Sequence, residues 1–117
     1  MELLRSFSYA LAGLRTLLGT ERNFRLEVAV AALAVIAGVW LGLERLEWAV
    51  LGLTIALVLI LEAVNTAVED AVTLASPELD PTARAAKDVS AAAVLVAAIL
   101  SVVVGVLLFG SRLFRIG

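Results

Sequence analysis

One helical face carries the residues best suited to chemistry: Glu62, Asn65, Thr66 and Glu69. At about 100° per residue, their spacing places all four on the same side of a helix. The preceding residues 48–61 are predominantly apolar, so this helix enters a membrane. A carboxylate inside the hydrocarbon costs at least about 2.5 kcal/mol by insertion scales, and such groups are functional by default. We interpret the face as a functional site. Helix–helix hydrogen bonding is the simpler alternative, and two glutamates fit it poorly.

Depth separates the roles expected for the two glutamates. If the helix enters the membrane near Trp48, Glu62 lies about 20 Å along it, within the hydrocarbon, at about 1.5 Å per residue. Glu69 then lies near the interface. A dry carboxylate suits a general base acting on a lipid hydroxyl. A carboxylate at the wet edge suits a divalent metal that carries a polyphosphate.

Two further charged residues fall at the level of Glu69. Glu21 on another helix could bracket one Mg²⁺ together with Glu69, whereas alone it would fit a partner for a helix N-terminus. Lys87, the only lysine of the chain, could neutralise phosphate charge or serve as an ordinary anchor at the membrane surface. No segment matches the G-x-x-x-x-G-K-[ST] phosphate loop, so a nucleotide site here would have to be built from helices alone.

Composition bounds the class of protein that holds these residues. Hydrophobic residues make up 62% of the 117 positions and charged residues 17%. Soluble domains average about 45–50% apolar and about 25% charged residues, so the excess indicates a membrane protein. The net charge of −2, without a dense basic cluster, excludes a nucleic-acid partner. Cysteine and histidine are absent, so a bound metal would have oxygen ligands, which favour hard cations such as Mg²⁺.

The pattern predicts an all-α integral membrane protein with three transmembrane helices and an N-terminal amphipathic surface helix. Residues 1–117 form a single membrane domain, in which 2–18 is the surface helix and 24–43, 46–74 and 89–110 are the membrane helices. Thr20 is expected to cap the second helix, and a loop with two prolines, residues 76–82, precedes the last span. The positive-inside rule places the N-terminus in the cytoplasm, although Arg112 and Arg115 on the outer side count against it.

Several stretches in order along the chain resemble the prokaryotic diacylglycerol kinase family, whose Gram-positive branch includes undecaprenol kinases. The most specific is Glu62–Glu69, which reads E-x-x-N-[ST]-A-[IV]-E and is followed by Ala86-Lys87-Asp88. The others are Ser6–Ala10 with Gly13-Leu14, Glu21–Arg25 and Ala91–Leu95. Together these stretches cover nearly the whole chain.

The resemblance implies a homotrimer in the bacterial cytoplasmic (inner) membrane, with active sites shared between subunits on the cytoplasmic side. It implies transfer of the γ-phosphoryl group of ATP, with Mg²⁺, to the hydroxyl of a membrane lipid alcohol. By the same resemblance, the catalytic residues are Glu62 and Asn65, and the metal ligands are Glu21 and Glu69. The nucleotide-binding positions are Tyr9, Glu21, Glu69, Glu78, Lys87 and Asp88. The positions near the lipid are Phe24, Arg25, Glu27 and Glu62.

Departures from the family pattern leave the lipid substrate open between diacylglycerol and undecaprenol. Thr73 stands where many members carry Asp. Ala91 resembles the Gram-positive branch, whereas Glu27 resembles the proteobacterial one. Arg84 has no assigned role. Two other classes of protein remain alternatives: a small proton-coupled transporter that uses Glu62, and a structural membrane subunit without a ligand.

Overall fold

The computed structural model describes residues 1–116, with side chains described through Phe114. The side chain of Arg115, one of the expected outer arginines, lies outside the described part. In chain order the helices are α1 (Glu2–Thr20), α2 (Arg22–Leu41), α3 (Arg45–Ala75), α4 (Pro81–Gly105), the short π-helix η1 (Val106–Gly110) and α5 (Ser111–Ile116). No strand occurs in this described part of the chain.

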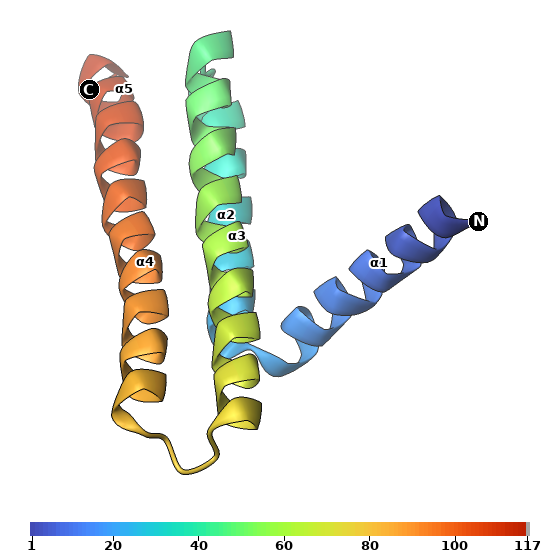
Figure 1. Ribbon diagram of the computed structural model, residues 1–117. Coiled ribbons are helices and arrows are strands. Elements are labelled where there is room, and N and C mark those ends of the chain that lie inside the picture. Colours follow the sequence, from blue (N-terminus) through green and yellow to red (C-terminus); the bar gives the residue numbers. More distant parts are fainter. Residues whose placement is uncertain (117) are drawn as a thin grey trace.

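Three helical segments are long and apolar enough to cross a membrane: α2, α3 and the continuous stretch Pro81–Phe114. The chain α3–loop–α4 forms an antiparallel hairpin, and α2 lies beside α3 (Figure 1). Large apolar side chains such as Leu33, Leu53 and Val96 stay exposed, as expected for helices that face lipid or other subunits. The structure thus confirms the predicted all-α membrane fold.

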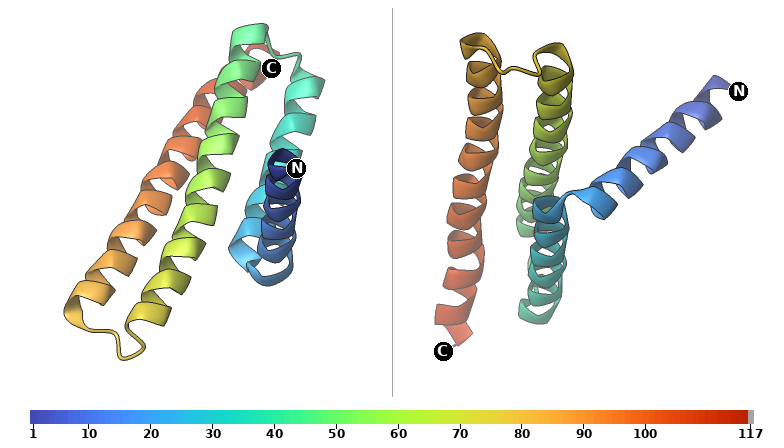
Figure 2. Two further views of the ribbon diagram at one scale, coloured as in Figure 1. Left: turned by 45° about the vertical axis from the view of Figure 1, so that its right-hand side comes forward. Right: turned by 90° about the horizontal axis from the view of Figure 1, so that it is seen from below.

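Helix α1 leaves the bundle near the start of α2 and has no buried residue (Figure 1 and the right-hand view of Figure 2). Its apolar side chains, among them Leu4, Phe7 and Leu14, are exposed. The Arg25 Nη1 atom donates to the Leu18 carbonyl at 3.0 Å, which joins the end of α1 to the first turn of α2. The amphipathic helix is therefore separate from the spanning helices, as a surface helix requires.

Two helix boundaries differ from the sequence-based expectation. Thr20 does not cap α2: it is the last residue of α1, its hydroxyl donates to the Thr16 carbonyl at 2.8 Å, and Glu21 takes the cap position. The helix of the third span begins at Pro81, well before residue 89. Proline is favoured in the first turn because its missing N–H is not needed there, and the Asp80 carboxylate accepts from the Ala83 N–H at 2.8 Å.

The opposite end of the bundle is closed by a polar contact that joins the two halves of the chain. Glu44 and Glu47 form a reciprocal capping box at the start of α3. Arg112 of α5 pairs with the carboxylate of Glu47, lies 3.8 Å from that of Glu44, and donates to the Gly42 carbonyl at 3.1 Å. We call this contact the Arg112 clasp.

Candidate active site

Glu62 lies on α3 at the centre of the predicted polar face and is the most buried charged side chain described, at 4% exposed. The carboxyl group of Glu27, from the first turns of α2, lies close enough to interact with it directly. The Glu27 Oε2 atom is buried and has no hydrogen-bond partner within the described residues. Two carboxyl groups in contact repel each other when both are ionised, so this pair requires a proton or a cation nearby.

Glu21, at the start of α2, lies beside the next turn of α3, on the side that carries Glu62. The Thr66 hydroxyl lies 3.4 Å from Glu21 Oε1 and 3.1 Å from the Glu62 carbonyl oxygen. Glu21 caps α2 by position, yet its side chain makes no capping hydrogen bond. Its carboxylate instead contacts Thr66 of α3, and its role in the site stays a prediction.

Asn65 and Glu69 complete the polar face. The Asn65 Nδ2 group donates to Glu69 Oε1 at 3.1 Å, and this bond fixes the orientation of both side chains. The Asn65 Oδ1 atom is buried and has no hydrogen-bond partner within the described residues. A buried oxygen without a donor is unfavourable, so this atom is available to accept a hydrogen bond or to coordinate a cation.

The carboxylates of this face form one group, which we call the acidic cluster: Glu21, Glu27, Glu62 and Glu69. Glu21 and Glu69 are close enough to act electrostatically on Glu62. The ion pairs found among the described side chains involve only Arg112, at the far end of the bundle. No group of three or more acidic, histidine or cysteine residues in the described part is already arranged around a metal position. The predicted metal pair Glu21–Glu69 therefore stays a prediction.

Lys87 lies just beyond the acidic cluster. Its Nζ atom donates to the Thr73 hydroxyl at 2.8 Å, and Thr73 is one helical turn past Glu69 on the same face of α3. Thr73, the departure from the family pattern, is thus the residue that holds the single lysine against α3.

The other predicted positions are spread over the chain. Tyr9 is 69% exposed on α1, while Glu78 in the loop before α4 and Asp88 on α4 are also exposed. Of the positions predicted near the lipid, Phe24 is buried and Arg25 is engaged by the end of α1. No hydrogen bond or ion pair joins Tyr9, Glu78 or Asp88 to Glu62 within the described part of the chain.

Comparison with known proteins shows which family this chain belongs to. The family described as prokaryotic diacylglycerol kinase matches residues 8–109. The chain belongs to the prokaryotic diacylglycerol kinase family. As a member of this family it is a lipid kinase, and the acidic cluster lies within the matched region.

Curated relatives of this kinase carry two different substrate names. An undecaprenol kinase of Bacillus subtilis (strain 168) is 38% identical over 109 residues, which cover 93% of this chain and 89% of the relative. A diacylglycerol kinase of Synechocystis is 45% identical over 104 residues, 88% of this chain but 59% of the relative. The diacylglycerol kinase of Escherichia coli (strain K12) is 32% identical over 110 residues, 94% of this chain and 90% of the relative.

Sequence reasoning missed two partnerships of this kinase. The contact between Glu27 and Glu62 joins two helices, and the only signal for it was a second carboxylate near the start of the first span. Thr66 was recognised as part of the polar face, but its link to Glu21 across the bundle was not. Side-chain contacts between helices depend on helix rotation, which hydrophobic periodicity fixes only coarsely.

Proposed function

We propose that this lipid kinase transfers the γ-phosphoryl group of ATP, with Mg²⁺, to the hydroxyl of a membrane lipid alcohol, diacylglycerol or undecaprenol. The observation that carries the proposal is the acidic cluster. It combines a buried carboxylate within a membrane-spanning helix, Glu62, with two possible metal ligands closer to the helix ends, Glu21 and Glu69. Glu62 accepts the proton of the lipid hydroxyl, the oxygen forms its bond to the γ-phosphorus, and the bond to the β-phosphate oxygen of ATP breaks to release ADP. Membership in an enzyme family favours this function over a transporter or a structural subunit.

Glu62 suits the role of base because of where it lies. Its carboxyl group is almost completely shielded, and Glu27 beside it comes from the neighbouring helix. A general base must lie within about 2.6–3.2 Å of the proton that it removes, which favours a rigid residue on a helix over one in a loop. Asn65, three residues further on, orients Glu69 through a hydrogen bond. Its own amide oxygen stays free to coordinate a cation near the phosphoryl group.

The donor atoms fit the magnesium ion that the reaction implies. Glu21 and Glu69 provide carboxylate oxygens, and Asn65 Oδ1 is a buried oxygen without a partner. Mg²⁺ prefers such oxygen ligands and usually keeps several waters and substrate phosphates in its shell. When bound, the ion would neutralise phosphate charge and so weaken the repulsion between the nucleotide and the acidic cluster. Lys87, held by Thr73, would add a further positive charge at the phosphate end.

A heptad pattern on α3 supports the proposed homotrimer. Apolar residues recur at alternating spacings of four and three along its whole length, and every one of them is exposed in the single chain. They are Leu46, Val50, Leu53, Leu57, Ile60, Val64, Ala67, Ala71 and Leu74. Such a seam favours a left-handed bundle of identical helices. The seam faces away from the acidic cluster, so subunits can assemble along α3 and supply Tyr9, Glu78 or Asp88 to one another's sites.

A side-by-side transfer assay tests the proposal. Purified protein in mixed micelles is given ATP labelled on the γ-phosphate, Mg²⁺, and diacylglycerol, undecaprenol or ceramide. We expect labelled lipid phosphate from diacylglycerol or undecaprenol and none without lipid. Phosphorylation of neither alcohol, by protein that remains folded and oligomeric, would refute the proposal. The ratio of the two rates identifies the physiological class of lipid.

A further inference from the structure

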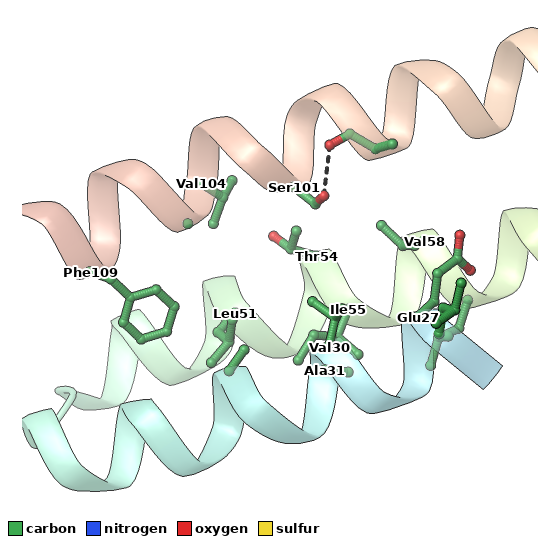
Figure 3. A pocket seen from close by; sticks show the side chains of 15 residues that line it. Glu27, Val30, Ala31, Leu51, Thr54, Ile55, Val58, Ser101, Val104 and Phe109 are labelled. Atoms are coloured by element: carbon green, nitrogen blue, oxygen red, sulfur yellow. Dashed lines mark hydrogen bonds between the residues drawn. The ribbon is translucent and has the colours of Figure 1, made fainter. Parts of the chain in front are cut away.

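An apolar groove runs from the acidic cluster toward the Arg112 clasp, and Glu27 is the only residue of the cluster that lines it. It lies between α2 and α4 with α3 as its floor, and its volume is about 350 Å³. Glu27 lines one end and Phe109 the other, with Thr54 and Ser101 between them (Figure 3). Glu27 also touches Glu62, so the groove opens directly into the catalytic centre.

The lining favours an apolar occupant. The Thr54 hydroxyl donates to the Val50 carbonyl and the Ser101 hydroxyl to the Ala98 carbonyl, each at 2.7 Å. Both polar groups are therefore satisfied by their own helices and require nothing from a ligand. Apart from Glu27 at its mouth, the groove presents only hydrocarbon, hydroxyl and backbone groups.

The size of the groove fits one hydrocarbon chain. Along α4 the groove extends from Ala98 to Phe109, about 16 Å at about 1.5 Å per residue. A single hydrocarbon chain, about 4.5 Å across at ordinary contact distances, fills about 250 Å³ over that length, and two chains fill about 500 Å³. The observed volume of about 350 Å³ therefore holds one chain but not two.

The far end of the groove is closed by a local irregularity of the third span. In the π-helix Val106–Gly110 each turn holds extra backbone, which changes the direction of the side chains that follow. Phe109 points into the groove from this segment (Figure 3). Three residues later, Arg112 fastens the chain to Glu47 and to the Gly42 carbonyl. The clasp therefore holds Phe109 in place as the end wall of the groove.

We propose that this groove holds one hydrocarbon tail of the lipid alcohol, and that Gly105 and Phe109, positioned by the Arg112 clasp, determine how long a tail is held. The inference rests on the proposed function and adds a specificity-determining region to it. Lipid tails are already in an apolar medium, so selectivity comes from packing and steric fit and not from removal of apolar surface from water. Tails that end short of Phe109 leave part of the groove unfilled, and longer tails gain no further contact.

Gly105 offers the test, because a Cβ added there meets open space within 4 Å while the residue itself lines the groove. Gly105→Leu would fill the outer part of the groove. Gly52→Leu is the matched control: Gly52 is a helical glycine of α3 whose added Cβ also meets nothing, and it does not line the groove. Gly105→Ala provides a milder variant if the larger one does not fold.

The measurement is kcat/KM for a short-tailed and a long-tailed member of the lipid class that the wild type accepts. The pairs are dioctanoylglycerol with dioleoylglycerol, or farnesol with undecaprenol. We expect Gly105→Leu to lower kcat/KM about tenfold for the long lipid, since overpacking of a fitted site has effects of this size, and less than about twofold for the short one. Gly105→Ala should show the same bias more weakly, and Gly52→Leu no bias. Phe109→Ala and Arg112→Gln should shift the preference toward longer tails without changing the KM for ATP.

Three results would overturn the inference. Equal loss for short and long lipids in Gly105→Leu would show that no tail reaches Gly105. A bias of the same size in Gly52→Leu would show a general membrane effect. Dissociation of the oligomer by Gly105→Leu, measured by light scattering, would assign the groove to a subunit contact. A wild type that phosphorylates no lipid at all refutes the proposed function itself and is separable from these outcomes.

Discussion

The two ends of the helix bundle treat negative charge in opposite ways. At one end, Glu44 and Glu47 lie beside Arg112, which pairs with the carboxylate of Glu47, and Glu47 also completes a helix cap. At the other, the acidic cluster gathers Glu21, Glu27, Glu62 and Glu69 with no ion pair from the described side chains. Paired charges stabilise a fold, whereas unpaired buried carboxylates are retained only where something else binds. This contrast predicts that the Arg112 clasp stabilises the fold and that the acidic cluster is the site of the chemistry.

Removal of divalent cations should affect the two ends most unequally. The acidic cluster needs an external cation before it can approach a polyphosphate, while the clasp carries its own arginine. Chelation of Mg²⁺ should therefore lower lipid phosphorylation by at least about a thousandfold, since a metal contributes several kcal/mol to charge stabilisation. The helical content, followed by circular dichroism, should not change. Full activity in excess chelator would contradict a metal at the acidic end.

Substitution of the outer carboxylates of the acidic cluster should weaken the nucleotide complex. Glu69→Gln and Glu21→Gln each remove one proposed oxygen ligand, and we expect the KM for Mg-ATP to rise about tenfold or more. The comparison is Glu44→Gln, which removes a carboxylate from the clasp end and should leave this KM unchanged. A similar KM for all three variants would show that the two ends are not functionally distinct.

The contact between Lys87 and Thr73 should have a smaller effect on nucleotide binding. Thr73→Val removes the hydroxyl that holds the lysine, and one such hydrogen bond corresponds to roughly two- to tenfold in affinity. We expect the KM for ATP to rise by that factor and to return toward the wild-type value in Thr73→Ser. Nucleotide titrations followed by thermal shift would measure it, because a ligand that binds the folded state raises the Tm. No change in Thr73→Val would remove Thr73 from the site.

Disruption of the clasp should affect stability more than turnover. Arg112→Gln removes the ion pair with Glu47 and the hydrogen bond to the Gly42 carbonyl, so the Tm should fall. With a short-tailed lipid, kcat should stay within about twofold of the wild type, because Arg112 lies at the opposite end from Glu62. Thermal unfolding and turnover measured on the same preparation would test this. A large loss of kcat with an unchanged Tm would reverse the assignment of the two ends.

The acidic end was largely predictable from the sequence, and the clasp was not. The spacing from Glu62 to Glu69 fixes one helical face whatever surrounds it, and the depth expected for Glu62 in the membrane follows from its distance from Trp48. The contact of Glu27 with Glu62 depends on how α2 rotates against α3, which the apolar pattern of a membrane helix leaves open. The clasp depends on the π-helix before Arg112, and no residue pattern in Val106–Gly110 distinguishes it from an ordinary helical turn.

Local capping also shows what the sequence can and cannot specify. Asp80 followed by Pro81 is a strong helix start, whereas the expected span was placed by hydrophobicity and covers only the apolar part of a longer helix. Thr20 has the right residue type for a cap, but its hydroxyl bonds backward to Thr16. Because Glu21 occupies the cap position, its carboxylate can turn toward Thr66, and a small shift in a helix boundary thus adds a residue to the acidic cluster.

The most direct test of the central claim compares Glu62→Gln with Glu47→Gln, the same change at the two ends. For each variant, transfer of labelled phosphate from ATP to lipid, nucleotide binding and Tm are measured on one preparation. We predict that Glu62→Gln lowers kcat by at least about a hundredfold, as loss of a general base does, with the Tm and nucleotide affinity retained. Glu47→Gln should lower the Tm and retain turnover of a short-tailed lipid. Normal turnover in Glu62→Gln would contradict Glu62 as the base and, with it, the acidic cluster as the catalytic centre.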